Sequence, residues 1–406
     1  MVELSKTEST PAAPARIGLV LPGGGARAAY QVGVLRAISD LLPSRSANPF
    51  PIISGTSAGA INATHLAIHA ERFRIATIKL ERVWRNFAVN QVFRADLISM
   101  LRGGLHWFLA VISGGWLLSP PKSLLDNQPL RQLLNVNFEF ERISQALEAG
   151  HLQALAIAAA SYSSRKSITF FEALPDRTAW QRMRRGGAAT KINVDHLMAS
   201  AAVPFLFPSV MLGEEYFGDG SMRQATPFSA AIHLGADRLL VVGTRNDTAH
   251  TRKIAARTPS FGQIFGYMLD ALFSDGLQAD LERLEQINDV LRQTGTLQIG
   301  GAKLKCVDIL AILPSRDLSE IARAHVLSLP RSLRVLLRTM GALNPGGGDL
   351  MSYLMFEGSY TRELIALGYS DAMARSIEIT AFLSGEQVSA DASLAARRVR
   401  NTTAVE

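Results

Sequence analysis

The chain has 406 residues, of which 48% are hydrophobic and 19% are charged, and its formal net charge is +7. This composition excludes a wholly disordered chain and supplies enough apolar side chains for one large or two ordinary domains. The modest positive charge favours contact with an anionic surface, either nucleic acid or lipid headgroups, without deciding between them. The single cysteine, Cys306, excludes an intramolecular disulfide framework, and its apolar neighbours predict a buried, inert thiol.

The two ends and one apolar stretch bear on cellular location. Residues 1–16 are polar and lack the apolar core of a secretory signal, so we expect a disordered leader. Residues 105–119 are apolar but shorter than the ~20 residues of a membrane-spanning helix, and a core helix and an apolar lid or acyl groove fit them equally well. We therefore expect a cytoplasmic protein without a transmembrane span. Residues 389–406 are small and polar, which predicts a flexible tail.

Strands and helices alternate along the first part of the chain. Apolar runs that predict buried strands lie at 17–22, 50–55, 152–162, 167–173 and 214–220. Helical patterns lie at 28–42, from Ala58 into the 80s, and from 195 to a stop at Pro204, and 227–244 indicates a helix, a glycine stop and another strand. Such alternation is typical of a parallel sheet covered on both faces. We predict a three-layer α/β/α domain with a mostly parallel sheet over 17–245.

The composition changes after Thr244. Residues 246–262 are polar and loop-like, which places a soft domain boundary there. Apolar residues then recur at helical spacing, at Leu277, Leu281, Leu284, Ile287 and Leu291. One further strand is predicted at 306–314, where it can return to the edge of the sheet. We predict a mainly helical C-terminal region over 246–388, interrupted at 344–349, and assign it no role.

The stretch IISGTSAGAIN, residues 52–62, places Ser57 between Gly55 and Gly59 in a G-x-S-x-G motif. Strand, tight turn and helix is the arrangement of a nucleophile elbow, where only small neighbours tolerate a strained serine backbone. The N-terminal N–H groups of the helix would also stabilise developing negative charge. A serine that merely caps an ordinary helix is the alternative. The flanking strand and helix favour a nucleophile.

Three consecutive glycines, Gly23, Gly24 and Gly25, follow the first predicted strand. Without Cβ atoms their N–H groups can approach a ligand closely, which predicts an oxyanion cradle. Arg27 can add charge or fix the loop. A dinucleotide fingerprint is disfavoured because Ala28 replaces its last glycine and no acidic residue ends the next strand. No Walker A sequence is present, and a plain tight turn is the remaining alternative.

Asp219 and His250 compete for the role of general base. Asp219 lies between two glycines at a predicted strand end, from which its carboxyl group can reach outward, although many such residues are ordinary turn aspartates. Asp247 and His250 would instead complete a Ser57–Asp247–His250 triad in a known chain order. The residues alone leave this choice open.

Metal and cofactor sites are not indicated. His65 and His69 have a metal-ligand spacing but no third ligand, and we expect them on a surface helix. No oxygen-rich calcium loop is visible, so we expect calcium-independent chemistry without a cofactor.

Two basic segments bear on partners. Arg331, Arg334 and Arg338 share one face of a predicted helix at 328–341, which either lies on an anionic membrane or, more commonly, packs its apolar face on the core. Residues 182–187 add positive charge on a predicted loop. No aromatic interleaving or known fold supports a nucleic-acid partner.

Four motifs in order, LPGGGARAAYQVGVLRA, GTSAGAINA, HLMASAAVPFLFP and YFGDGS, make residues 17–245 resemble the patatin-like phospholipases, which are lipid acyl hydrolases. The resemblance implies that Ser57 is the nucleophile and that Asp219 takes its proton directly, as a Ser–Asp dyad. It also implies that Gly23, Gly24 and Gly25, with Arg27, form the oxyanion loop.

The chain departs from this family at two positions. Ala28 replaces a glycine of the loop, and Ser221 replaces a glycine or alanine after the aspartate, but both are small. We expect an ester hydrolase that forms an acyl-enzyme on a lipid substrate, in peripheral contact with a membrane. The alternatives are an impaired lipid-binding or regulatory module and an acyltransferase on the same scaffold. Lipid class, chain length and oligomeric state stay open.

Overall fold

The computed structural model describes residues 15–95, 123–224, 226–245, 258–294, 298–299, 302–303, 305–344 and 347–386. Most of the predicted leader, the apolar stretch at 105–119, the Asp247–His250 motif and the predicted tail lie outside the described residues. Among the described residues, no helix has both the length and the apolar character needed to cross a membrane.

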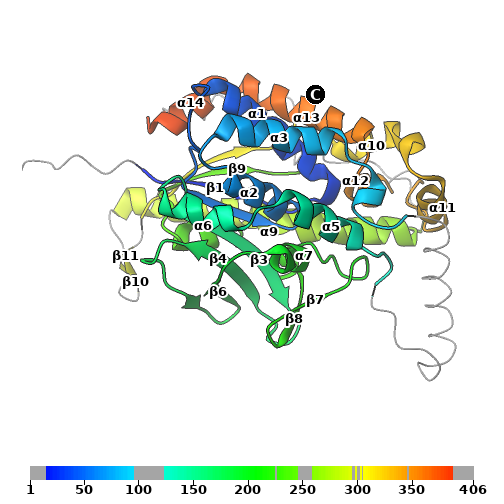
Figure 1. Cartoon of the computed structure of the whole chain (residues 1–406), viewed down its shortest axis with the longest axis horizontal. Coiled ribbons are helices and arrows are strands. Elements are labelled where there is room, and N and C mark those ends of the chain that lie inside the picture. The colour runs from blue at the N-terminus through cyan, green and yellow to red at the C-terminus, as the bar shows by residue number, and fades with distance from the viewer. Residues whose placement is uncertain are drawn as a thin grey trace, which may run out of the picture.

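A mixed sheet forms the centre of the molecule (Figure 1). Its neighbouring strands are, in order, β12 (Asp308–Ile312), β9 (Arg238–Val242), β1 (Ile17–Leu21), β2 (Ile52–Thr56), β3 (Ala154–Ser161), β4 (Ser167–Ala173), β6 (Arg185–Ala189) and β5 (Trp180–Gln181). The path from β12 to β3 is parallel throughout, so these strands end at one edge. β8 (Glu215–Asp219) joins that edge antiparallel to β3 and pairs with β7 (Val210–Leu212). β10 (Gln298–Ile299) and β11 (Ala302–Lys303) form a separate hairpin.

Helices cover both faces of the sheet, as predicted. Side chains alternate along the central strands: Leu19 and Ile53 belong to the larger hydrophobic cluster, whereas Val20 and Ile52 belong to the smaller one on the opposite face. The larger cluster includes residues of α1 (Ala29–Leu41), α2 (Ala58–Ile68), α3 (Phe73–Arg85), α6 (Glu141–Glu148) and α13 (Gly358–Ala374). The smaller one includes residues of α8 (Ser229–His233) and α9 (Phe261–Thr294). The three-layer α/β/α prediction is confirmed.

Shorter helices complete the described part of the chain. They are η1 (Gly25–Ala28), η2 (Val89–Gln91), α5 (Gln128–Asn137), α7 (Val194–Ser200), η3 (Gly220–Arg223), α10 (Leu318–Ala324), η4 (Val326–Ser328), α11 (Arg331–Thr339), α12 (Gly348–Leu354) and α14 (Ser376–Ser384).

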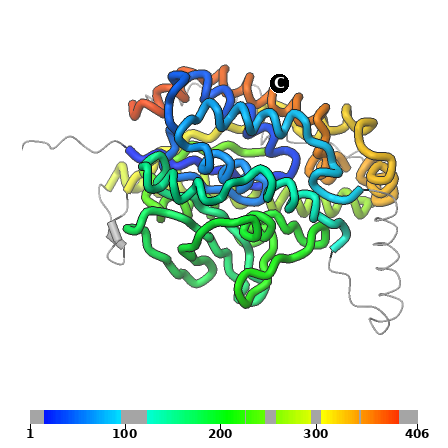
Figure 2. Tube along the Cα trace, in the orientation of Figure 1, coloured from blue at the N-terminus to red at the C-terminus, as the bar shows by residue number. Residues whose placement is uncertain are grey.

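The C-terminal helices pack directly on the N-terminal ones. Figure 2 shows the orange and red end of the trace running beside the blue N-terminal helices, and α13 lies against α1. Leu350 and Tyr360 belong to the same buried cluster as Leu19. The strand predicted at 306–314 is β12, which lies at the sheet edge beside β9 as expected.

Two predicted helices differ from the structure. The helix expected from Ala58 into the 80s is two helices, because the N–H of Asn48 donates to the Ala70 carbonyl and holds a turn between α2 and α3. The helix expected to stop at Pro204 already ends at Ser200, where the Ala202 carbonyl accepts the N–H of Asp219 instead. Both breaks depend on contacts with distant parts of the chain, which local periodicity does not encode.

The structure also tests the predicted environments of Cys306 and of the basic helix α11. The prediction of a buried Cys306 is wrong: the thiol is exposed, because it comes just before β12 and the neighbouring Val307 faces the core instead. On α11, Leu333 and Leu337 are buried, so the apolar face of this basic helix packs on the core, which was the commoner of the two alternatives. Residues 185–187 belong to β6 and only the preceding ones form a loop.

The crossing of α1 and α13 gives a stability prediction. A Cβ added at Gly33 would lie 2.0 Å from the Ile365 carbonyl oxygen, and one at Gly368 would lie 2.2 Å from the Tyr30 carbonyl oxygen. Gly33→Ala should therefore lower the free energy of unfolding by ~2 kcal/mol, despite the better helix propensity of alanine. Urea denaturation measures this, with the exposed Ala366→Ser on α13 as a control that changes it by less than ~0.5 kcal/mol. An unchanged stability of Gly33→Ala would contradict the close crossing.

Candidate active site

Ser57 lies in the turn that joins β2 to α2. Its φ of 53° and ψ of −127° are rare for a residue other than glycine. The Ser57 N–H donates to the Ser200 hydroxyl at 2.8 Å, and the Ser57 carbonyl accepts the N–H of Ala60. A Cβ at Gly59 would lie 2.1 Å from the Leu21 carbonyl oxygen, so no larger residue fits there. The turn therefore has the strained geometry that the G-x-S-x-G motif predicts.

Asp219 ends β8 beside this turn, and its side chain is fully buried. Its Oδ1 accepts the N–H of Ser221 at 2.9 Å, whereas its Oδ2 has no hydrogen-bond partner in the part of the chain that the structure describes. Burial raises the pKa of Asp219 to about 6, while the nearby hydroxyl of Ser57 and the N–H of Ser221 lower this pKa because they favour the ionised form. The structure thus brings Ser57 and Asp219 together.

The glycine loop lies next to both residues. Gly25 has a φ of 53° and lines the same cavity as Ser57, and a Cβ at Gly25 would lie 2.4 Å from the Tyr353 carbonyl oxygen. A Cβ at Gly23 would lie 2.9 Å from the hydroxyl oxygen of Ser221. The close packing explains why this loop needs glycine.

Arg27 points away from the Ser57 cavity, into the C-terminal helices. Its guanidinium forms ion pairs with Asp270 of α9 at 3.0 Å and with Asp349 of α12 at 3.1 Å. It also donates to the hydroxyls of Ser352 and Tyr353. Two roles were considered for Arg27, adding charge to the site and fixing the glycine loop. These ion pairs and hydrogen bonds correspond to the second role.

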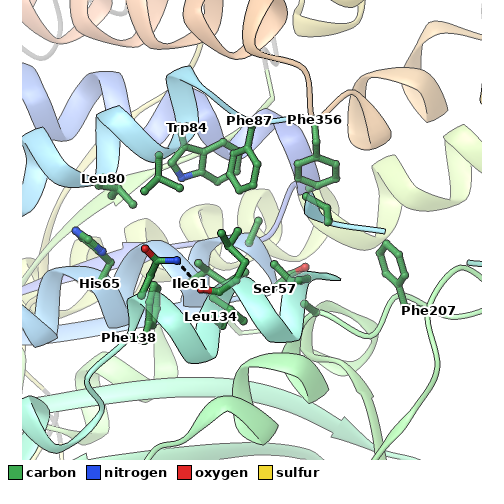
Figure 3. A pocket seen from close by; sticks show the side chains of 18 of the residues that line it. Ser57, Ile61, His65, Leu80, Trp84, Phe87, Leu134, Phe138, Phe207 and Phe356 are labelled. Carbon is green, nitrogen blue, oxygen red and sulfur yellow. Dashed lines mark hydrogen bonds between the residues drawn. The ribbon is translucent and has the colours of Figure 1, made fainter. Parts of the chain in front are cut away.

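A cavity of about 330 Å³ opens beside Ser57, between α2, α3 and α5 (Figure 3). Most of its lining is apolar, with Ile61, Leu80, Trp84, Phe87, Leu134, Phe138, Phe207 and Phe356 among the contributors. In the close-up, Ser57 lies toward one end and His65 toward the other. The polar groups at the His65 end include His69 and Lys79. An extended apolar chain attached near Ser57 fits this shape.

The prediction that His65 and His69 lie on a surface helix is wrong. Their exposed fractions are only 6% and 8%, because α3 packs over α2. His65 Nε2 lies 3.1 Å from the Ala76 carbonyl oxygen, and the two rings stack at 4.6 Å. Burial lowers the pKa of His65 to about 3, so its ring is neutral. The described ranges contain no group of three metal-ligating side chains.

Some residues of the site were missed or lie outside the described chain. Ser200 holds the Ser57 N–H, and the hydroxyl of Thr244 donates to the Gly23 carbonyl at 3.0 Å. Ser200 belongs to the quoted motif HLMASAAVPFLFP, which was the available signal, whereas nothing local marks Thr244. Asp247 and His250 are among the residues that the structure does not describe, so the triad alternative stays a prediction.

The fold and this edge of the sheet define a class: a three-layer α/β/α protein with a glycine loop and a strained serine between strand and helix. A family model described as patatin-like phospholipase matches residues 19–232, and the chain belongs to that family. Over 266 residues the chain is 26% identical to a cGAMP-activated phospholipase of Pseudomonas aeruginosa, covering 63% of this chain and 70% of that protein. Both findings support a lipid hydrolase.

The buried carboxyl group makes stability depend on pH. Below about pH 4 Asp219 is neutral in both states, whereas above about pH 6 folding must bury its charge, at a cost of up to ~3 kcal/mol. Asp219→Asn should therefore be more stable than wild type at pH 8, by ~1–3 kcal/mol, and the difference should vanish near pH 4. Urea denaturation across this range measures it.

The exposed Asp289→Asn serves as control and should show no such trend. A wild type that is the more stable protein at pH 8 would mean that the Asp219 carboxylate is well solvated or paired, against the burial described above.

Proposed function

We propose that this protein is a serine lipid acyl hydrolase with Ser57 as nucleophile and Asp219 as its general base. The observation that carries the proposal is a buried carboxyl group, with one oxygen that has no hydrogen-bond partner among the described residues, beside a serine in a strained turn. The Ser57 oxygen bonds to the ester carbon while its proton moves to Asp219. Asp219 then protonates the departing alcohol, which leaves an acyl-enzyme that water hydrolyses with the aspartate again as base.

The same environment supports the proposed chemistry. An aspartate of ordinary pKa is a weak base for a serine hydroxyl, and burial makes Asp219 a stronger one. Backbone N–H groups of Gly23, Gly24 and Gly25 are the proposed oxyanion donors, each typically worth ~10²–10³ in kcat. Arg27 keeps that loop in place through its ion pairs, as a positioning residue.

The substrate we propose is an ester of a lipid. The apolar cavity beside Ser57 offers space for an acyl chain, and such a substrate implies peripheral contact with a membrane surface. The scheme needs no metal or other cofactor. Transfer of the acyl group to an alcohol in place of water would use the same residues.

Control by a ligand is a second element of the proposal. The similar protein of P. aeruginosa is named as a phospholipase that cGAMP activates. We propose that a cyclic dinucleotide also activates this chain, and an arginine-lined cavity next to the Asp219 turn supports this.

Fatty-acid release from mixed phospholipid vesicles tests the dyad, with and without cyclic GMP–AMP. Ser57→Ala should lose at least ~10³-fold of the rate because no nucleophile remains, and Asp219→Asn ~10²–10⁴-fold because no base remains. The exposed Ser163→Ala should behave as wild type, and circular dichroism checks that every variant folds.

Three other results would change the assignment. Activity that survives in Asp219→Asn but is lost in His250→Ala would favour the triad. Vesicle binding without release by wild type would favour a lipid-binding module. A new ester in the presence of an alcohol would favour an acyltransferase.

The cavity predicts a dependence on acyl-chain length. Ile61 follows Ser57 by one helical turn, or ~6 Å, and lines the cavity. Ile61→Trp should therefore block the cavity and lower the release of long acyl chains by ~10-fold or more, while a short acetate ester is hydrolysed at the wild-type rate. Ile78→Trp, on the exposed side of α3, is the matched control. An equal loss with both esters would mean that the acyl chain lies elsewhere.

A further inference from the structure

A second cavity, of about 780 Å³, lies on the face of the sheet that α8 and α9 cover, opposite the Ser57 cavity. Strands β4 and β5, the turn η3 and the helices α8 and α9 all contribute to its wall. The basic side chains that line it are Arg182, Arg184, Arg185, Arg223 and Arg283. They come from widely separated parts of the chain and meet around one space.

Positive charge exceeds negative charge in this arginine cavity. None of these five arginines forms an ion pair with a described residue, and Arg185 donates to the Thr226 hydroxyl. The acidic residue in the lining, Asp275, faces Arg245 at 3.6 Å. Nearby Asp280 lies in the field of Arg185 and Arg283, but its carboxylate accepts the N–H of Phe228. The cavity therefore lacks enough acid to balance its guanidinium groups.

The side chain of His233 lies next to the arginine cavity and is affected by its positive charge. His233 stacks on Trp180, and burial lowers the pKa of the His233 ring, with Arg182 and Arg185 lowering it further. The lowered pKa of His233 thus reflects the positive electrostatic potential of these arginines, in addition to burial.

Guanidinium groups in this arrangement suit a polyanion. Arginine binds phosphate oxygens through two parallel hydrogen bonds, and its plane stacks on aromatic bases. The volume is within the range of small-molecule sites, and a concave wall suits a compact ligand better than a flat bilayer. Two or more phosphodiester groups on one small molecule could each meet arginines from a different element.

The wall of the arginine cavity contacts Asp219 and the residue that precedes Ser57. Ser221 lines the cavity, and its N–H holds Oδ1 of Asp219 at 2.9 Å. Gln224 lines it too and accepts the Thr56 hydroxyl at 2.5 Å, one residue before Ser57. A void of about 10 Å³ beside Ser221 also reaches Gly23 of the glycine loop. A ligand that fixes η3 would therefore fix Asp219 and the turn before Ser57.

We propose that the arginine cavity is an effector site for a small ligand with two or more phosphodiester or phosphate groups, which raises kcat by ordering η3. Without the ligand, repulsion between Arg223 of η3 and the arginines before β6 favours their separation. When the ligand is bound, its phosphate groups bridge Arg223 and the arginines before β6 and hold them together. The effect on kcat rests on the proposed hydrolase, whereas ligand binding does not.

The test measures binding and activity separately, on the full chain. Calorimetry on Ser57→Ala, which cannot turn over lipid, uses cyclic GMP–AMP and inorganic pyrophosphate, and vesicle sedimentation compares phosphatidylglycerol with phosphatidylcholine. We expect cyclic GMP–AMP to bind and Arg182→Glu or Arg223→Glu to weaken it by at least ~10-fold, as expected for a lost guanidinium–phosphate contact. Arg292→Glu, on the same helix as Arg283 but outside the cavity, should leave binding unchanged.

Each outcome decides a different point. Binding only to phosphatidylglycerol vesicles would overturn the proposed small polyanion, because each of these lipids carries a single phosphodiester on a bilayer surface. Binding of neither soluble probe nor vesicles, or binding that both variants retain, would overturn the site. Ligand binding without any fatty-acid release by wild type would overturn the proposed hydrolase and leave the site standing.

The activity arm tests the coupling through η3. Ligand should raise the kcat of wild type with little change in KM, and Arg223→Glu should lose this ligand-dependent increase. An increase that persists in Arg223→Glu would show that the arginine cavity does not transmit the signal.

Discussion

Close approach of backbone segments around Ser57 is the constraint on which this edge of the molecule depends. A Cβ at Gly59 would lie 2.1 Å from the Leu21 carbonyl oxygen, and one at Gly220 would lie 2.2 Å from the Ala158 carbonyl oxygen. Three chain segments, after β1, β2 and β8, therefore turn within contact of one another. The strained φ of Ser57 persists because these contacts fix the backbone on both sides of it.

The C-terminal helices are part of the same arrangement. Gly25 packs on the backbone of Tyr353, and the buried guanidinium of Arg27 joins the loop to Asp270 and Asp349. A buried charge with several partners is costly to break, because loss of one partner leaves the others uncompensated. The region to which the sequence assigned no role thus supports the glycine loop. Its supporting residues lie more than 240 positions from Arg27 along the chain.

Features that depend on residues close together in the sequence could be predicted, whereas features that depend on residues far apart in the sequence could not. The strand, the tight turn and the start of the helix around Ser57 are encoded within residues 52–62, so that geometry could be predicted. The burial of His65 and His69 could not, since it depends on α3 folding back over α2, and a helix pattern does not reveal a second covered face. The arginine cavity was equally hidden, because only the part of its lining within residues 182–187 stood out as basic in the sequence, while Arg223 and Arg283 are supplied by η3 and α9.

The central sheet separates an apolar cavity on one face from a positively charged cavity on the other face. An apolar cavity lies on the side of α2 and α3, and a cavity rich in guanidinium groups lies on the side of α8 and α9. If acyl chains enter the apolar cavity, as proposed, arginines there would have to be desolvated by each incoming chain, at a cost of several kcal/mol per charge. Asp219 stands between the two sides and is held from the arginine side through Ser221. A polyanion bound in the arginine cavity, as proposed, would act on the carboxyl group through one peptide N–H without its charge entering the apolar cavity.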